Sequence, residues 1–155
     1  MTEVPMLAGD NTVEGLAAEV LGCFGELQLR VTGSSMLPSV RPGDVLTIRR
    51  CAMSAVESGA IVLFTRDGRL FAHRVVARRN THLVTRGDAL EWHDPPVRQG
   101  QLLGRVVTLT RNGRPRQPPS LTIARRIAAG VVRRSGRARW LLAAGARLRR
   151  RRVDA

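Results

Sequence analysis

The chain has 155 residues and a formal net charge of +14 at pH 7, from 26 basic and 12 acidic side chains. This length is enough for one domain with appended segments and argues against two full domains. All 26 basic residues are arginine, which stays protonated in proteins, so a mechanism that needs a neutral lysine as its base is excluded.

Residues 1–28 are expected to form an N-terminal segment with one short amphipathic helix. Met1–Asp10 lacks the basic start and the apolar core of a secretory signal. After Asn11 and Thr12, which suit a helix N-cap, apolar residues recur every three or four positions as far as Phe24. Residues 12–27 contain three glutamates and are too polar and too short to span a bilayer. We therefore expect a cytoplasmic protein that is at most peripheral on the inner face of the membrane.

Residues 29–110 are expected to fold as a compact antiparallel β domain, which makes the chain mainly β (α+β). Short apolar runs separated by Gly, Pro, Asp or Asn are typical of strands joined by tight turns. Asp67-Gly68 is a pair that two-residue hairpin turns favour. The predicted strands are Gln28–Thr32, Val45–Arg49, Ala60–Thr65, Leu70–Ala77, His82–Thr85 and Gly104–Thr110.

Residues 111–155 are expected to be a proline-containing linker, residues 111–119, followed by a basic helical tail. Residues 120–155 hold eleven arginines and a single acid, Asp154, and apolar residues lie between the arginines at loosely helical spacing. This pattern predicts an amphipathic tail that contacts an anionic membrane or an acidic partner, with a solvated basic tail as the alternative. Direct nucleic-acid recognition is disfavoured, because the tail offers only Trp140 for base stacking and contains no DNA-binding motif.

Neither a metal nor an organic cofactor is expected. The two cysteines, Cys23 and Cys51, form no CxxC pair and have no metal-ligand spacing with any histidine. We expect both to be reduced and to pack as small buried apolar side chains.

Three groups of residues could together form a catalytic site. Ser35 lies in a polar turn between two predicted strands, where rigid neighbours would hold a nucleophilic hydroxyl in place. Strand alternation puts His73 on the face opposite Arg74, among apolar side chains, and a neutral histidine is a competent base near neutral pH. Asp88 and Asp94 follow along the chain, and either could accept a hydrogen bond from the imidazole.

These residues belong to an ordered set of short segments: 33–38 (GSSMLP), 41–45 (RPGDV), 59–64 (GAIVLF), 72–76 (AHRVV), 85–88 (TRGD) with Asp94, and 103–106 (LGRV). As a set they resemble the signal peptidase I superfamily of serine peptidases, which includes LexA-like self-cleaving repressors. Histidine stands where many members have lysine, so the chain is similar to the archaeal and endoplasmic-reticulum type, without the transmembrane anchor of typical members.

The resemblance implies a role for each residue of the set. Ser35 would be the nucleophile, His73 the general base, and Asp88 or Asp94 the orienting acid. The turn around the nucleophile would shape the substrate groove and the oxyanion site, with the backbone N–H of Ser35 as one donor. The residues of that turn are Gly33, Ser34, Met36 and Pro38. Because Gly33 replaces a hydroxyl residue common in signal peptidases, oxyanion stabilisation would rest on the backbone or on Ser34.

The expected function is that of a signal-peptidase-like serine endopeptidase, a hydrolase with a Ser-His dyad or a Ser-His-Asp triad. Its substrate would be a dedicated precursor peptide or protein with small residues before the scissile bond, so peptide maturation is expected rather than secretory cleavage. Two alternatives stay open. One is a non-catalytic domain of the superfamily that binds a lipid surface or nucleic acid through its arginine-rich tail, and the other is a self-cleaving LexA-like regulator.

Overall fold

The N-terminal helix packs one face on the sheet and leaves the other exposed. The computed structural model describes residues 13–120, and within them α1 spans Val13–Phe24. Ala17 and Leu21 are buried, whereas Cys23 on the outer face is exposed, so the expectation that this cysteine is buried is wrong. Cys51 is half-buried, and both thiols are free. Nowhere in residues 13–120 is there a helix long and apolar enough to cross a membrane.

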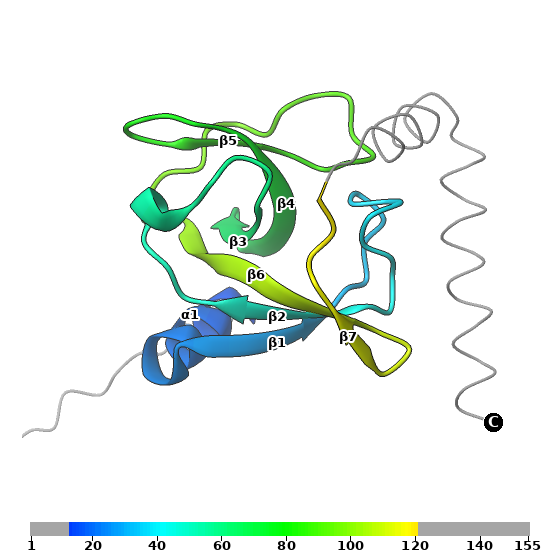
Figure 1. The fold of residues 1–155 in the computed structure, drawn as a ribbon. Coiled ribbons are helices and arrows are strands. Elements are labelled where there is room, and N and C mark those ends of the chain that lie inside the picture. The colour runs from blue at the N-terminus through cyan, green and yellow to red at the C-terminus, as the bar shows by residue number, and fades with distance from the viewer. Residues whose placement is uncertain (1–12, 121–155) are drawn as a thin grey trace, which may run out of the picture.

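The strands of the described chain form one antiparallel sheet (Figure 1). Its order is β1-β2-β6-β3-β4-β5, and β7 pairs with β6. The expected mainly β (α+β) architecture with an N-terminal helix is thus confirmed, whereas the tail predicted beyond Ser120 lies outside the described residues. The strands are β1 (Glu26–Arg30), β2 (Val45–Arg49), β3 (Ile61–Arg66), β4 (Arg69–Arg78), β5 (Leu83–Arg86), β6 (Leu102–Arg111) and β7 (Arg114–Arg116), with a short 3-10 helix, η1 (Met53–Ala55), before β3.

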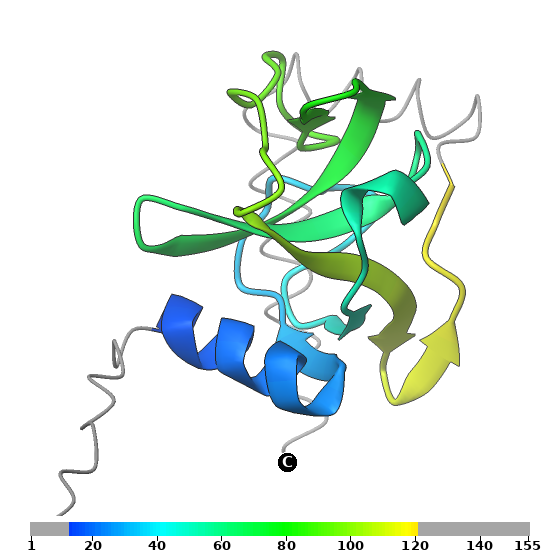
Figure 2. The ribbon, with the colours of Figure 1, turned by 90° about the vertical axis from the view of Figure 1, so that its left-hand side faces the viewer.

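The β3–β4 hairpin sets the register of the strand that carries the predicted base. Asp67 and Gly68 both have positive φ, as a tight hairpin turn requires, and the turn predicted from this pair is confirmed. The register that follows places His73 of β4 opposite Val62 of β3. Figure 2 shows α1 lying below this hairpin.

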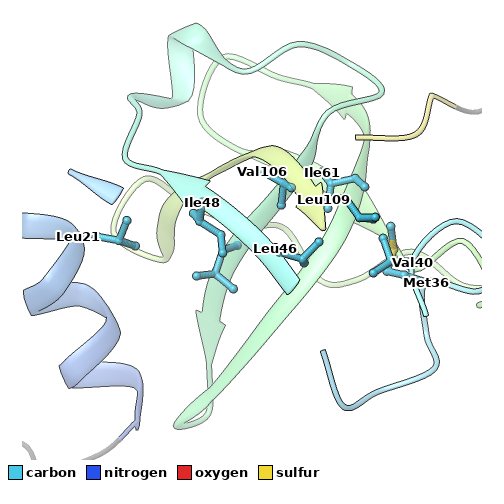
Figure 3. Packing of buried hydrophobic residues seen from close by; sticks show 9 residues of the cluster. Leu21, Met36, Val40, Leu46, Ile48, Ile61, Val106 and Leu109 are labelled. Carbon is cyan, nitrogen blue, oxygen red and sulfur yellow. The ribbon is translucent and has the colours of Figure 1, made fainter. Parts of the chain in front are cut away.

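Two large apolar clusters fill the interior, and a small third one consists of Leu37 and Ala89. One contains Val62, Phe64 and Val75, and the other joins strands β2, β3 and β6 to α1 and to the loop between β1 and β2. Figure 3 shows the second cluster running from Leu21 of α1 to Met36 of that loop. The loop that holds Ser35 is therefore attached to the core and not only to its flanking strands.

The stretch predicted as a linker, residues 111–119, is partly a strand. Asn112 and Gly113 take positive φ and turn the chain, so that β7 pairs with the end of β6. Pro115 is tolerated there because β7 is an edge strand, where a missing N–H costs no ladder bond on its open side. Proline content alone predicted a linker, whereas pairing across the turn decides the structure.

Candidate active site

Ser35 lies in the loop between β1 and β2, residues 31–44, whose two ends are tied together. Val31 N–H donates to Asp44 O and Gly43 N–H donates to Val31 O, both at 2.8 Å. Between these ends, Met36 and Val40 are buried in the core. A loop closed at its base and anchored by two apolar side chains holds the serine in a defined place.

An ion pair holds the C-terminal end of this loop. Arg111 donates to both carboxylate oxygens of Asp44, at 2.9 and 2.6 Å, and to Ser39 O at 3.0 Å. Asp44 also accepts the Arg41 N–H at 2.8 Å. A bidentate guanidinium-carboxylate pair is directional as well as strong, so it limits how far the loop can shift.

His73 bridges the serine and an acid. Its Nε2 lies 2.9 Å from Ser35 Oγ, and its Nδ1 lies 2.8 Å from Asp94 Oδ2. A carboxylate only accepts hydrogen bonds, so Nδ1 carries the proton and Nε2 is left to accept the serine O–H. The rings of Phe64 and Phe71 pack against the imidazole, with centroids 6.0 and 5.8 Å away, and leave His73 only 3% exposed.

Asp94 is held in the ionised form by two donors. Besides His73, Thr85 Oγ1 donates to its Oδ2 at 2.7 Å, and the Asp94 N–H donates to Thr85 O at 2.8 Å. Burial by itself would raise the pKa of Asp94, but the hydrogen bonds from His73 and Thr85, with the nearby charge of Arg66, bring the pKa below its ordinary value. Sequence reasoning gave Thr85 no role in the site, because only the structure shows that its hydroxyl is fully buried and therefore needs a partner.

Asp88, the other acid of the sequence-based prediction, lies against Arg74 and not against His73. Arg74 Nε and Nη2 donate to its two carboxylate oxygens at 2.8 and 2.7 Å, and the two side chains are 3% and 2% exposed. Strand alternation already placed Arg74 opposite His73. A buried arginine needs a carboxylate partner, but the burial of Arg74 is known only from the structure, so the sequence left Asp88 and Asp94 as alternatives.

The segment around Asp88 also contacts the nucleophile. Ala89 N–H donates to Ser35 O at 2.8 Å. The backbone passes so close that a Cβ placed on Gly87 would lie 2.7 Å from the same oxygen. Only glycine fits there, so the segment 87–89 fixes the main chain of Ser35 from one side, as His73 fixes its hydroxyl from another.

The segment of the chain that holds the predicted catalytic residues matches a known family. The model of the peptidase S24-like family aligns with residues 25–107, which is more than half of the chain and contains Ser35, His73, Asp88 and Asp94. The chain belongs to the peptidase S24-like family. This confirms the expected membership in the superfamily of signal peptidase-like and LexA-like serine peptidases. No curated protein matches the chain.

The remaining residues predicted for the site of this S24-like protein lie in the turn around Ser35. Gly33 is exposed, Ser34 and Pro38 are half-buried, and Met36 is buried in the core. Within residues 13–120 the Ser35 N–H donates to no protein acceptor, which leaves it free for an oxyanion. The same residues contain no cluster of His, Cys, Asp and Glu that could hold a metal ion.

Proposed function

We propose that the protein is a serine endopeptidase in which Ser35, His73 and Asp94 act as a triad. The observation that carries this proposal is the unbroken line of hydrogen bonds from Ser35 Oγ through the imidazole to the Asp94 carboxylate, at 2.9 and 2.8 Å. Acyl transfer to serine requires a nucleophile, a base and an orienting acid within hydrogen-bonding distance of one another, and these separations meet that requirement. Membership in the peptidase S24-like family supports the same reaction.

In the proposed mechanism, Ser35 Oγ attacks the scissile carbonyl while His73 Nε2 takes up the hydroxyl proton. The Asp94 carboxylate keeps the other ring proton on Nδ1 and stabilises the imidazolium that forms. The Ser35 N–H donates to the developing oxyanion. His73 then passes its proton to the leaving amine, which gives the acyl-enzyme, and a water molecule activated by the same nitrogen releases the new carboxyl end.

The proposed substrate is a dedicated precursor peptide or protein. The resemblance to signal peptidases supports small residues before the scissile bond. The eleven arginines of residues 120–155 support a further contact with an anionic surface or an acidic partner. Vesicles containing phosphatidylglycerol, titrated with salt, test that contact, because binding through the arginines must weaken as ionic strength rises.

A fluorophosphonate probe tests the mechanism without knowledge of the substrate. The full chain should be labelled once, at Ser35, and Ser35→Ala and His73→Ala should abolish labelling. Ser54→Ala and His82→Ala are matched controls outside the site and should be labelled like the wild type. Labelling that persists in His73→Ala, or that never occurs in the folded wild-type protein, would exclude the proposed triad chemistry.

Cleavage itself is tested with candidate precursors and with the protein alone. Intact-mass measurement after incubation should show products with the wild type that are absent with Ser35→Ala. Products common to both proteins would contradict the proposal. A mass loss in the wild type without added substrate would identify self-cleavage.

A further inference from the structure

The Arg74 guanidinium binds two backbone carbonyls in addition to Asp88. Besides the two bonds to that carboxylate, its Nη1 donates to Gly59 O at 2.8 Å and to Pro119 O at 2.9 Å. The guanidinium is almost completely buried. If the Pro119 carbonyl moved away, Arg74 Nη1 would lose one of its two acceptors in a buried site. The cost of an unsatisfied buried donor favours the attached over the detached segment by about 5- to 150-fold.

The acceptor belongs to a segment that follows the last strand. Pro118 and Pro119 are half-buried, whereas Gln117 before them and Ser120 after them are exposed. Figure 2 shows this part of the chain, in yellow, running from β7 toward the turn before β3. The family match ends at residue 107, so Pro119 lies outside the matched region.

The guanidinium connects this segment to the nucleophile by a short path. Arg74 holds Asp88 by both oxygens, and the next residue, Ala89, donates its N–H to Ser35 O at 2.8 Å. The arginine cannot turn toward another acceptor without losing its fixed, bidentate geometry on Asp88. Any change at the Pro119 carbonyl therefore acts on the residues that place Ser35.

We propose that residues 117–120 form a C-terminal strap that positions the nucleophile, through Arg74, Asp88 and Ala89. Pro119 accepts a hydrogen bond from Arg74 and not from the hydroxyl of Ser35 or the imidazole of His73, so the strap is a positioning element and not a catalytic one. Its effect on reactivity rests on the proposed peptidase function, whereas its effect on the Ala89 hydrogen bond does not. The functional unit then extends about a dozen residues past the family match.

The test loosens the strap in the full chain with the double substitution Pro118→Gly and Pro119→Gly. Replacing two prolines by glycine increases the freedom of the detached segment, so the detached population should rise by about 4- to 30-fold. Pro115→Gly is the matched control, because this exposed proline lies in β7 and makes no contact with Arg74. Two readouts are measured: hydrogen exchange of the Ala89 amide, and the fluorophosphonate labelling of Ser35 as a function of probe concentration.

In the double variant we expect faster exchange at Ala89 with unchanged exchange at the core amides of β2. The labelling rate at saturating probe should fall several-fold, while the half-saturating probe concentration and the pH midpoint of labelling stay the same, because His73 and Asp94 are untouched. Pro115→Gly should change none of these. A purely structural strap would lower the melting temperature and leave the labelling rate of the folded protein unchanged.

The outcomes separate the two proposals. Faster Ala89 exchange in a protein that is never labelled supports the strap's connection to the nucleophile loop and refutes the peptidase. Normal labelling with unchanged Ala89 exchange refutes the strap and leaves the peptidase intact. Exchange that rises equally at Ala89 and throughout β2 reports global unfolding and also refutes the strap.

Discussion

Asp94→Asn is expected to separate the orienting role of this carboxylate from its contribution to the fold. The carboxylate accepts hydrogen bonds from His73 Nδ1 at 2.8 Å and from Thr85 Oγ1 at 2.7 Å. Asparagine keeps the shape and one acceptor, but its NH2 group is a donor. His73 would then turn an unprotonated Nδ1 toward residue 94, and its protonated Nε2 could not take up the proton of Ser35.

The magnitude of the loss follows from this tautomer change. A wrongly protonated imidazole in a Ser-His-Asp triad lowers the rate by about 10⁴-fold, which corresponds to about 5.5 kcal/mol in the activation barrier. The free energy of unfolding should fall far less, because the Thr85 hydroxyl, which shares Oδ2 with His73, can turn and accept a hydrogen bond from the new NH2 group. One hydrogen bond to a charged group contributes only about 1.5–3 kcal/mol. Reactivity should thus drop by orders of magnitude in a protein that remains folded.

The assay is the rate of Ser35 labelling by the fluorophosphonate at pH 7, followed by intact mass, with urea unfolding measured on the same samples. Asp67→Asn is the matched control, since Asp67 is exposed in the β3–β4 turn and asparagine tolerates the same positive φ. If Asp94→Asn is labelled within about tenfold of the wild type, the tautomer argument fails and Asp94 is not the orienting acid.

The same variant gives a prediction in acid. The pKa of Asp94 is below its ordinary value, since the hydrogen bonds from His73 and Thr85 outweigh the effect of burial. A carboxyl group with a lowered folded pKa stabilises the protein above its unfolded pKa and loses this contribution as pH falls through the folded pKa. The stability advantage of the wild type over Asp94→Asn should therefore shrink below about pH 4. An advantage that is undiminished at about pH 2 would contradict the lowered pKa.

Two further substitutions probe the backbone of the nucleophile and the buried ion pair. Gly87→Ala places a Cβ 2.7 Å from Ser35 O, and displacing a nucleophile by about 1 Å can cost about 10²-fold in rate, so labelling should fall by that order. Gly100→Ala, where a Cβ meets nothing within 4 Å, should be labelled like the wild type, and equal labelling of the two variants would contradict the close approach. Asp88→Asn leaves the Arg74 charge buried without its partner and should lower the free energy of unfolding by about 3–5 kcal/mol, measured by urea denaturation. A loss below about 1 kcal/mol would show that Arg74 and Asp88 do not form this ion pair in solution.

Much of the fold could be predicted because the relevant signals are local. The apolar spacing after Val13 predicts a helix, and residues 13–24 form α1. Asp67-Gly68 predicts the hairpin turn, since few residue pairs tolerate positive φ twice. Alternation along β4 likewise predicts that His73 and Arg74 point to opposite faces, as their separate partners show.

The choice between Asp88 and Asp94 could not be predicted from local signals. Both acids follow β5 within one loop, and nothing in their spacing says which returns to His73. The path of that loop decides, because Asp94 N–H bonds back to Thr85 O and so brings its carboxylate beside the imidazole. β7 was missed for a similar reason, since its pairing with β6 outweighs the proline that argued against a strand.

By itself, the sequence determined which chemistry the protein could support. The absence of lysine excluded an amine base, and the order of Ser35, His73 and the two acids pointed to the superfamily that the family match then confirmed. Only the tertiary structure decided which atoms meet: Ser35 with His73 at 2.9 Å, and Pro119 with Arg74 at 2.9 Å. Residue types and strand periods are properties of neighbouring positions, whereas hydrogen bonds between residues 38 and 45 positions apart depend on how the whole sheet closes.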